Sequence, residues 1–515
     1  MSKVVAQELL VLTLAAPALG ALIAVALPAR IDRTARVTGT VFAWLAFVAS
    51  ALLALDRSGP LAPSGRLAIA PWHEINWPWA PGLNLTFHIG VDGISFPLVL
   101  LTTLLTAVCA SYTCVKVPSF AGGGPGGGRL LVALLLVIEV GIVGVFLALD
   151  LVLFFVFFEV VLLPMYAVIA GWGGPARRHA ARKFVLYTLF GSVLLLVGVF
   201  TVVAATGTAD LVALTSGTGA QMARGTQLAA FVLFAVAFAV KSPLWPLHTW
   251  LPDAHTEAPT VGSVILAGVL LKMGTYGLLR VGVGVAPDAA ARVAPVLGVL
   301  AVAAIVVGGL VCLAQDELKR LIAYSSVGHM GFVLLGIATL TATGFQAALI
   351  GNIAHGVITG LLFFLAGAVK DRAHTGALAE LGGLREVAPG LAGVLGYAAI
   401  ASLGLPGLAG FWGEAFAIFA AFGRHETLWT VLGVIAAVGA ALAAAYFLRL
   451  LRQVTHGPAT PIVAGLPSPR LAGIELVSWA PLVLLALALG LAPALVLGLS
   501  ADPVAALTGV LASVR

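Results

Sequence analysis

Six ionisable side chains stand inside long apolar stretches of this 515-residue chain, and their types suit proton transfer. In chain order they are Glu159, Lys241, Lys272, His329, His355 and Glu414. A charge in the hydrocarbon layer of a membrane costs at least about 2.5–3.5 kcal/mol, so such residues usually mark an ion or proton path. A nearby carboxylate changes the proton affinity of a buried lysine, and histidine can pass a proton between its two ring nitrogens. The series predicts a proton relay.

The alternative for each residue taken singly is a snorkelling side chain or a structural ion pair. Six such residues in nearby apolar segments argue against that alternative for the whole set. No metal-ligand spacing is found among them, and a path lined by lysines would repel Na⁺. We therefore expect protons as the cargo and no metal site.

Other polar residues fit the relay less clearly. A cluster that follows Lys241 is a candidate route for proton uptake, with a solvated loop as the alternative; it consists of His248, Asp253, His255 and Glu257. Glu139 also lies within an apolar stretch. It is either a structural carboxyl paired with a partner or a further relay group.

The composition requires a lipid environment. Apolar residues make up 61% of the chain and charged residues only 9%, whereas soluble domains carry about 25% charged residues. So few charges cannot cover a water-exposed surface, which excludes a soluble enzyme, a nucleic-acid binder and a disordered protein. The net charge of +6 therefore indicates no nucleic-acid partner.

Apolar runs long enough to cross a bilayer predict an all-α polytopic membrane protein of about 14 transmembrane helices. The expected spans are 4–27, 37–55, 94–115, 130–149, 151–171, 183–206, 227–247, 260–283, 293–313, 318–340, 345–369, 391–420, 428–451 and 471–499. We expect the first to be an uncleaved helix, and residues 56–93, with Trp72, Trp77 and Trp79, to form an interfacial cap with aromatic anchors.

Lysines and arginines predict the orientation. The loops on one side of the expected membrane carry roughly twice as many of them as the other side. Positive loops face the cytoplasm, so both termini are expected on the extracytoplasmic side. The abundance of Ala, Gly and Val favours a GC-rich bacterial genome, and hence a bacterial cell membrane.

Two expected helices are broken beside a charge. Lys241 is followed by Pro243 and Pro246, and Glu414 follows Gly404 and Pro406. Breaks at membrane depth are tolerated only where they line a cavity or a wet path. The breaks, in the seventh and twelfth expected helices, lie about 170 residues and five helices apart, and an odd separation reverses the direction of equivalent helices. We therefore expect an inverted repeat of helices 4–8 and 9–13, with units 1–129, 130–283, 284–452 and 453–515.

Three runs of residues resemble one known family. They are KSPLWPLHTWLPDAHTEAPTVGSVILAGVLLKMGTYG (241–277), DELKRLIAYSSVGHMGF (316–332) and NIAHGVITGLLFFLAG (352–367). These runs resemble the antiporter-like subunits of respiratory NADH:quinone oxidoreductase (complex I), a family that also includes large subunits of multi-subunit Na⁺/H⁺ antiporters. The resemblance implies fourteen helices with the inverted repeat. Most members carry lysine in the twelfth helix and one complex I subunit carries glutamate, so Glu414 indicates that subunit.

The resemblance also implies roles. Glu159 would pair with Lys241, Lys272 would be the central lysine, His329 and His355 would connect it to Glu414, and Glu414 would release the proton. NADH oxidation and quinone reduction would occur in other subunits, so no NADH, FMN, iron–sulfur cluster or quinone is expected in this chain. Expected partners are lipid and other membrane-arm subunits, including two antiporter-like siblings. The alternatives are a subunit of a multi-subunit cation/proton antiporter and a membrane scaffold that moves no ions.

Overall fold

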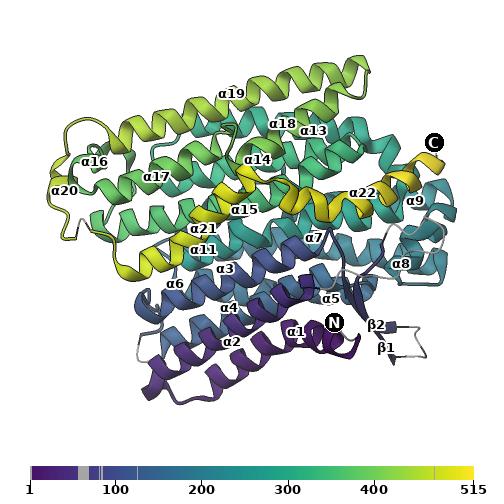
Figure 1. Cartoon of the computed structure of the whole chain (residues 1–515), viewed down its shortest axis with the longest axis horizontal. Coiled ribbons are helices and arrows are strands. Elements are labelled where there is room, and N and C mark those ends of the chain that lie inside the picture. Colours follow the sequence, from purple (N-terminus) through teal and green to yellow (C-terminus); the bar gives the residue numbers. More distant parts are fainter. Residues whose placement is uncertain are drawn as a thin grey trace.

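The computed structural model describes residues 3–55, 69–80, 82, 85–123, 126–468 and 470–514. Within these residues it has 14 helices that are long and apolar enough to cross a membrane, by length and composition. Most of them lie side by side in one bundle, with their axes roughly aligned (Figure 1). The predicted polytopic helical fold is confirmed.

Ten of the longer helices are single continuous elements. They are α1 (Lys3–Ala26), α2 (Asp32–Leu52), α3 (Phe96–Val115), α4 (Gly127–Leu147), α7 (Arg177–Thr206), α9 (Arg224–Lys241), α13 (Pro287–Leu313), α14 (Leu318–Ala338), α15 (Ala342–Ala373) and α19 (Thr427–Thr455). One of them, α9, ends at the break that follows Lys241. The other helices are shorter or follow one another in pairs. They are α5 (Leu151–Val160), α6 (Leu162–Trp172), α8 (Leu211–Ala213), α10 (Trp250–Glu257), α11 (Thr260–Ile265), α12 (Lys272–Gly277), α16 (Leu384–Val387), α17 (Pro389–Ser402), α18 (Ala409–Phe422), α20 (Pro461–Ala464), α21 (Gly473–Leu491) and α22 (Ala494–Val514).

Two expected spans differ from the helices observed. The expected span 391–420 is divided into α17 and α18, each shorter than a full crossing, and the expected final span 471–499 becomes α21 and α22. Each pair runs in succession through the bundle (Figure 1). Pro493, directly before α22, lacks the backbone N–H that a continuous helix would need. One predicted span thus corresponds to two helices in both places.

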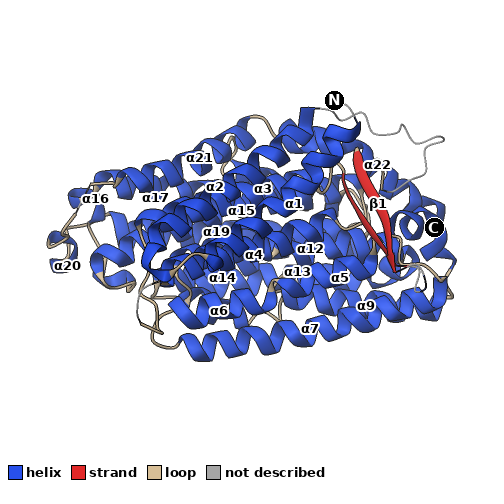
Figure 2. Cartoon of the chain, turned by 90° about the horizontal axis from the view of Figure 1, so that it is seen from below, coloured by secondary structure: helices blue, strands red, loops and turns tan. Residues whose placement is uncertain are grey.

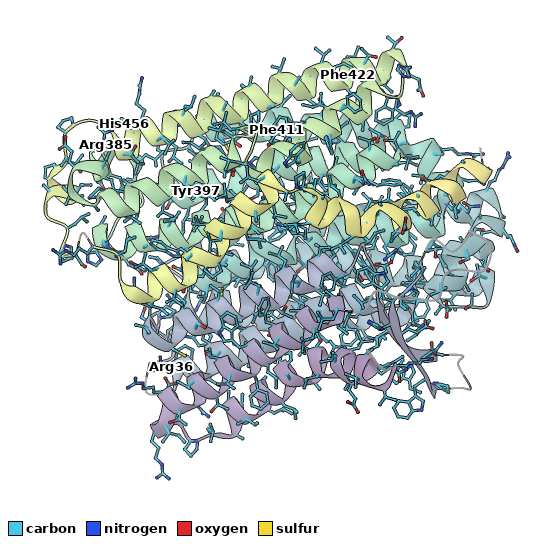
Figure 3. The ribbon with its side chains drawn as sticks, viewed as in Figure 1. Arg36, Arg385, Tyr397, Phe411, Phe422 and His456 are labelled. Atoms are coloured by element: carbon cyan, nitrogen blue, oxygen red, sulfur yellow. The ribbon has the colours of Figure 1, made fainter. Side chains whose placement is uncertain are left out.

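The two broken helices run in opposite directions. Figure 1 shows α9 beginning at the end of the bundle where the strands lie, and α17 beginning at the other end. This is the arrangement that an inverted repeat requires. Figure 3 shows Arg36, Arg385 and His456 at the end of the bundle opposite the strands.

A β-hairpin lies where an interfacial cap was expected. The prediction of an all-α protein did not include it. Strand β1 (His73–Ala80) pairs antiparallel with β2 (Leu85–Val91) at one end of the bundle (Figure 2). Apolar residues occupy every second position of β2, and Ile75, Trp77 and Trp79 do so in β1, which is the pattern of a two-faced strand. Trp77 and Trp79 are exposed, as expected for aromatic anchors, and residues 56–68 of the expected cap lie outside the described residues.

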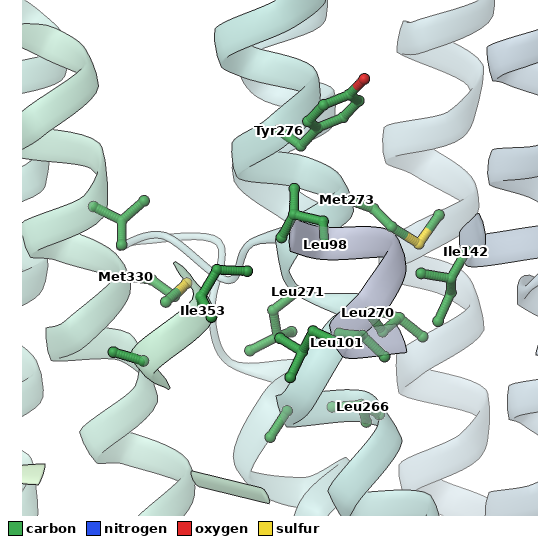
Figure 4. Packing of buried hydrophobic residues seen from close by; sticks show 14 of the residues in the cluster. Leu98, Leu101, Ile142, Leu266, Leu270, Leu271, Met273, Tyr276, Met330 and Ile353 are labelled. Atoms are coloured by element: carbon green, nitrogen blue, oxygen red, sulfur yellow. The ribbon is translucent and has the colours of Figure 1, made fainter. Parts of the chain in front are cut away.

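The helical stretch Thr260–Val283, which carries Lys272, is the best-shielded span in the described part of the chain. Its most apolar window is completely buried within the protein. Figure 4 shows Leu98 and Leu101 of α3 packed among Leu270, Met273 and Ile142. Two π turns, Leu266–Leu270 and Leu278–Val283, interrupt this stretch, which we expected to be one regular helix. Such π turns occur frequently at functional sites.

A buried ion pair anchors the C-terminal end of this stretch. Arg280 donates to Asp92, which precedes α3, and both side chains are almost fully buried. The guanidinium Nε also donates to the hydroxyl of Tyr276, 3.4 Å away. Asp92 Oδ1 in turn accepts from the backbone N–H groups of Ile94 and Ser95. The pair therefore ties the span that carries Lys272 to the chain between the hairpin and α3.

Removing the charge of Asp92 should destabilise the protein strongly. Asp92→Asn keeps an oxygen for the backbone donors but leaves Arg280 buried without its counter-ion, a change that costs about 3–5 kcal/mol. The control is Asp316→Asn, because Asp316 is 90% exposed in its pair with Arg449 and such pairs contribute about 0–1 kcal/mol. Thermal unfolding of the detergent-solubilised assembly measures both. Equal melting temperatures for the two variants would contradict a stabilising role for the buried pair.

His88 holds the hairpin to the helices. Its Nδ1 lies 3.1 Å from Asp210, which caps α8, and its Nε2 lies 3.2 Å from Glu74 of β1. Burial alone would lower the pKa of His88, but the hydrogen bonds and negative charges of Asp210 and Glu74 raise it above its usual value. Asp150, in a β-bridge with Asp210, adds a further carboxyl to this cluster.

The hairpin should therefore loosen at alkaline pH. A raised pKa in the folded state means that the contribution of His88 is complete below its unfolded pKa of about 6.5 and is lost as the pH rises through the folded value. Hydrogen exchange of the β2 amides, corrected for intrinsic rates between pH 6 and 9, should show protection that falls with pH. His88→Gln should remove this dependence, whereas His425→Gln, a histidine outside the cluster, should keep it. A wild-type protection that does not vary with pH would contradict the role of His88.

Candidate proton-translocation site

Lys272 and His355 are in direct contact at the centre of the bundle. Lys272 Nζ lies 2.6 Å from His355 Nδ1 and also donates to the carbonyl of Ala267. The neighbouring pair Thr275 and Asn352 forms a hydrogen bond of 2.9 Å between the same two segments. Residues three apart share a helix face, so this second bond holds the lysine and the histidine in register.

His329 joins the two halves of the broken twelfth helix. Its Nδ1 lies 3.0 Å from Glu414 Oε1 on α18, and its Nε2 lies 3.1 Å from Ser402 Oγ at the end of α17. Ser402 and Glu414 are both buried. The helix break therefore brings side chains from both sides of the interruption onto one imidazole ring. Ser402 was not among the predicted site residues, although its place just before Gly404 and Pro406 was a usable signal.

The two histidines face each other across a small cavity. Their ring centroids are 5.7 Å apart, and a cavity of about 20 Å³ is lined by both rings together with Ser402 and Glu414. That volume is enough for one water molecule. His355 Nε2 is buried and has no hydrogen-bond partner among the described residues. A bridging water would connect Lys272 and His355 to His329 and Glu414.

Lys241 ends α9 at the first break. Its Nζ lies 4.5 Å from the centre of the Phe158 ring, and no ion pair within 4 Å joins it to Glu159 in the part of the chain that the structure describes. One carboxylate oxygen of Glu159 is buried without a hydrogen bond from any described residue. The two side chains are thus neighbours in a separated state rather than a closed pair.

Two side-chain hydrogen bonds form at this break, one to a backbone carbonyl of the break itself and one to a carbonyl of the stretch that carries Lys272. The indole N–H of Trp250 donates to the carbonyl of Val240 over 2.9 Å. The hydroxyl of Ser242 donates to the carbonyl of Leu271, also over 2.9 Å, directly beside Lys272. Broken helices persist at membrane depth only when their free polar groups find such partners. The second bond ties the break at Lys241 to the central lysine.

The four proposed proton-uptake residues have different environments. Asp253 accepts a hydrogen bond of 2.7 Å from Lys183, and Glu257 accepts one of 2.9 Å from the backbone N–H of Ala176. Both carboxylates therefore hold the end of α10 to neighbouring segments. His255 is fully buried, stacks on Phe363 and has no described partner for either ring nitrogen, and His248 is nearly buried.

Glu139 remains without an assigned role. It is completely buried in α4, and neither of its carboxyl oxygens has a hydrogen-bond partner among the residues that the structure describes. The alternative of a structural carboxyl bonded to a partner side chain in this chain therefore finds no support in the described contacts.

The backbone of the second break depends on two glycines with positive φ. Gly404 has φ +81° and Gly407 has φ +88°. A Cβ atom on Gly404 would lie 2.7 Å from Glu414 Oε2, whereas a Cβ atom on Gly407 would meet nothing within 4 Å. Gly404 thus leaves the space that the second carboxylate oxygen occupies.

Comparing Gly404→Ala with Gly407→Ala should separate the effect of backbone strain from the effect of displacing the Glu414 carboxylate. Both substitutions cost about 1–2 kcal/mol for the left-handed conformation, and only Gly404→Ala also displaces the carboxylate of Glu414. We expect similar losses of thermal stability but a much larger loss of proton-coupled turnover for Gly404→Ala than for Gly407→Ala. Equal turnover in the two assembled variants would show that the position of Glu414 is unimportant.

Fold and site together define a polytopic membrane protein whose buried amines, imidazoles and carboxylates extend through successive helices. The family model described as NADH:quinone oxidoreductase/Mrp antiporter, TM, matches residues 148–439. The chain belongs to this family, and the resemblance stated from its sequence is confirmed.

Curated relatives agree with this assignment. The chain is 43% identical over 389 residues to NAD(P)H-quinone oxidoreductase chain 4 1 of Synechococcus sp. (strain JA-3-3Ab), covering 74% of this chain and 72% of the relative. It is 39% identical over 440 residues to NADH-quinone oxidoreductase subunit M of Rhodobacter capsulatus, covering 83% and 82%. Both names belong to the subunit type that Glu414 indicated.

Solved structures share the fold. A chain of respiratory complex I from Thermus thermophilus with bound NADH superimposes with a TM-score of 0.84 at 30% identity, over 98% of this chain and 100% of that one. A chain of the Mrp complex from Dietzia sp. DQ12-45-1b gives a TM-score of 0.79 at 24% identity, over 98% of this chain and 52% of that one. At 24% identity, the match to the Mrp complex chain shows a shared fold and nothing further.

Proposed function

We propose that the chain is a proton-translocating membrane-arm subunit of a NADH:quinone oxidoreductase, of the subunit M or chain 4 type. The observation that carries the proposal is the near-continuous contact series from Lys272 to Glu414. It consists of the 2.6 Å contact of Lys272 with His355, the water-sized cavity, and the 3.0 Å contact of His329 with Glu414. A protein that served only as a scaffold would gain nothing from these desolvated groups.

The relay operates through changes in local charge. When Glu159 approaches Lys241, the carboxylate stabilises the ammonium, and when it withdraws, the desolvated lysine releases its proton. The separated geometry of the two residues corresponds to the releasing state. The proton passes to Lys272, then through the two nitrogens of His355 and the cavity to His329, and finally to Glu414. Glu414 releases it on the extracytoplasmic side.

His255 is the best candidate for proton uptake among the residues after Lys241. Asp253 and Glu257 are engaged in contacts that hold α10, whereas both ring nitrogens of His255 lack a described partner. A fully buried imidazole without hydrogen bonds is costly unless it serves a function. We assign it to the route between the cytoplasmic face and the central lysine.

The redox chemistry belongs to partners. NADH, FMN, iron–sulfur clusters and quinone are assigned to other subunits, and the chain contacts further membrane-arm subunits, including two antiporter-like siblings. The membrane is a bacterial cell membrane with both termini on the extracytoplasmic side. The second candidate function, a subunit of a cation/proton antiporter, is favoured by the fold shared with the Mrp complex. Glu414 in place of lysine favours the first.

Replacing Lys241 should block proton transfer through the relay. Lys241→Ala removes the group whose proton affinity Glu159 controls, so we expect proton pumping and quinone reduction to fall by about 100-fold, the size of a lost proton-transfer group. NADH oxidation by an artificial electron acceptor should remain, because it does not involve this chain. The control is Lys3→Ala, an exposed lysine at the start of α1. Wild-type pumping by an assembled Lys241→Ala complex would refute the relay.

Assembly is measured on the same membranes. The chain is tagged, solubilised in mild detergent and run on a native gel stained for NADH oxidation. NADH activity should migrate with the tag in a very large complex, for both the wild type and Lys241→Ala. A smaller complex without NADH activity, together with cation-dependent proton flux, would assign the chain to the antiporter function instead.

A further inference from the structure

Ser402 occupies a special position in the site. It is the last residue of α17, it is buried, and its side chain lines the cavity between the two histidines. The hydrogen bond found for its hydroxyl goes to His329 Nε2, 3.1 Å away. Ser402 thus lines the cavity and at the same time contacts the His329 nitrogen that does not bond Glu414.

The protonation of His329 determines whether the hydroxyl of Ser402 donates or accepts the hydrogen bond between them. An ionised carboxylate only accepts hydrogen bonds, so His329 Nδ1 carries a hydrogen when it contacts ionised Glu414. In the neutral ring Nε2 is then an acceptor, and Ser402 donates to it. When the ring is doubly protonated, Nε2 donates and the oxygen of Ser402 accepts. A hydroxyl can rotate between these two roles without any change in charge.

We propose that the Ser402 hydroxyl delivers protons from the cavity to His329 Nε2, an inference that rests on the proposed function above. A protonated water in the cavity, supplied from His355 Nε2–H, gives its proton to Ser402 Oγ. The hydroxyl proton of Ser402 moves to His329 Nε2 in the same step. One Oγ–H bond forms and one breaks, Ser402 ends unchanged, and the positive charge moves from the cavity to His329 beside Glu414.

Two substitutions of Ser402 whose new side chains have nearly the same shape as each other separate this role from packing. Thr keeps the hydroxyl and Val replaces it with a methyl group of nearly the same size, so the pair Ser402→Thr and Ser402→Val differs mainly in the proton-transferring atom. In the whole assembled complex, we expect Ser402→Val to lower proton pumping and quinone reduction by about tenfold or more. Ser402→Thr should retain most of the activity. NADH oxidation with an artificial acceptor should be unchanged in both.

A second serine supplies the matched control. Ser478 of α21 is also buried, but its hydroxyl has no hydrogen-bond partner among the described residues. Ser478→Ala should therefore leave pumping unchanged, whereas Ser402→Ala should reduce it as Ser402→Val does. The solvent deuterium isotope effect on quinone reduction should increase in Ser402→Val, because the impaired proton step then limits the rate, and a purely structural role would not produce this.

The outcomes distinguish this inference from the function on which it rests. Wild-type turnover in Ser402→Val, with Lys241→Ala inactive, would overturn the role of Ser402 and leave the relay in place. Equal losses in the Thr and Val variants would assign Ser402 to packing and would likewise overturn it. Wild-type pumping in both Ser402→Val and Lys241→Ala would refute the proposed function itself.

Discussion

Backbone N–H and C=O groups within a membrane must be hydrogen-bonded inside the protein, because the hydrocarbon contains no water to bond them. Regular helices meet this requirement by themselves, but the breaks after Lys241 and Ser402 do not. At the first break the indole of Trp250 binds the carbonyl of Val240, and Ser242 binds the carbonyl of Leu271. The indole of Trp250 therefore completes the backbone bonding at the first break, and the hydroxyl of Ser242 does the same for a carbonyl of the neighbouring stretch Thr260–Val283.

The same constraint explains where the proposed relay groups lie. An unpaired charge is expensive in this interior, and the structure places each central group against another polar group: Lys272 against His355, and His329 between Glu414 and Ser402. The Lys241–Glu159 pair differs, since its members are separated and the ammonium lies over the Phe158 ring.

Much of this was predictable from single residues. A charge in an apolar run is visible in any sequence, so all six proposed relay residues could be named from it, and prolines and glycines beside Lys241 and Glu414 indicated the breaks. The hairpin at His73–Ala80 and Leu85–Val91 was not foreseen, because its tryptophans also fit a cap at the membrane surface. The π turns on both sides of Lys272 were not predicted either. An apolar run has the same composition whether its backbone forms α-helical or π-helical hydrogen bonds. The division into 1–129, 130–283, 284–452 and 453–515 remains a prediction.

Composition and local motifs are enough to show that this chain lies in a membrane, that it carries acids and bases in apolar segments, and which family it belongs to. Which of those acids and bases touch one another depends on the packing of the helices. The contact of Lys272 with His355, and the hydroxyl of Ser402 on His329, join residues more than 70 positions apart. Such distances depend on how helices pack and where they break. Helix packing is a collective outcome of many small contacts, so no local pattern of residues can specify it.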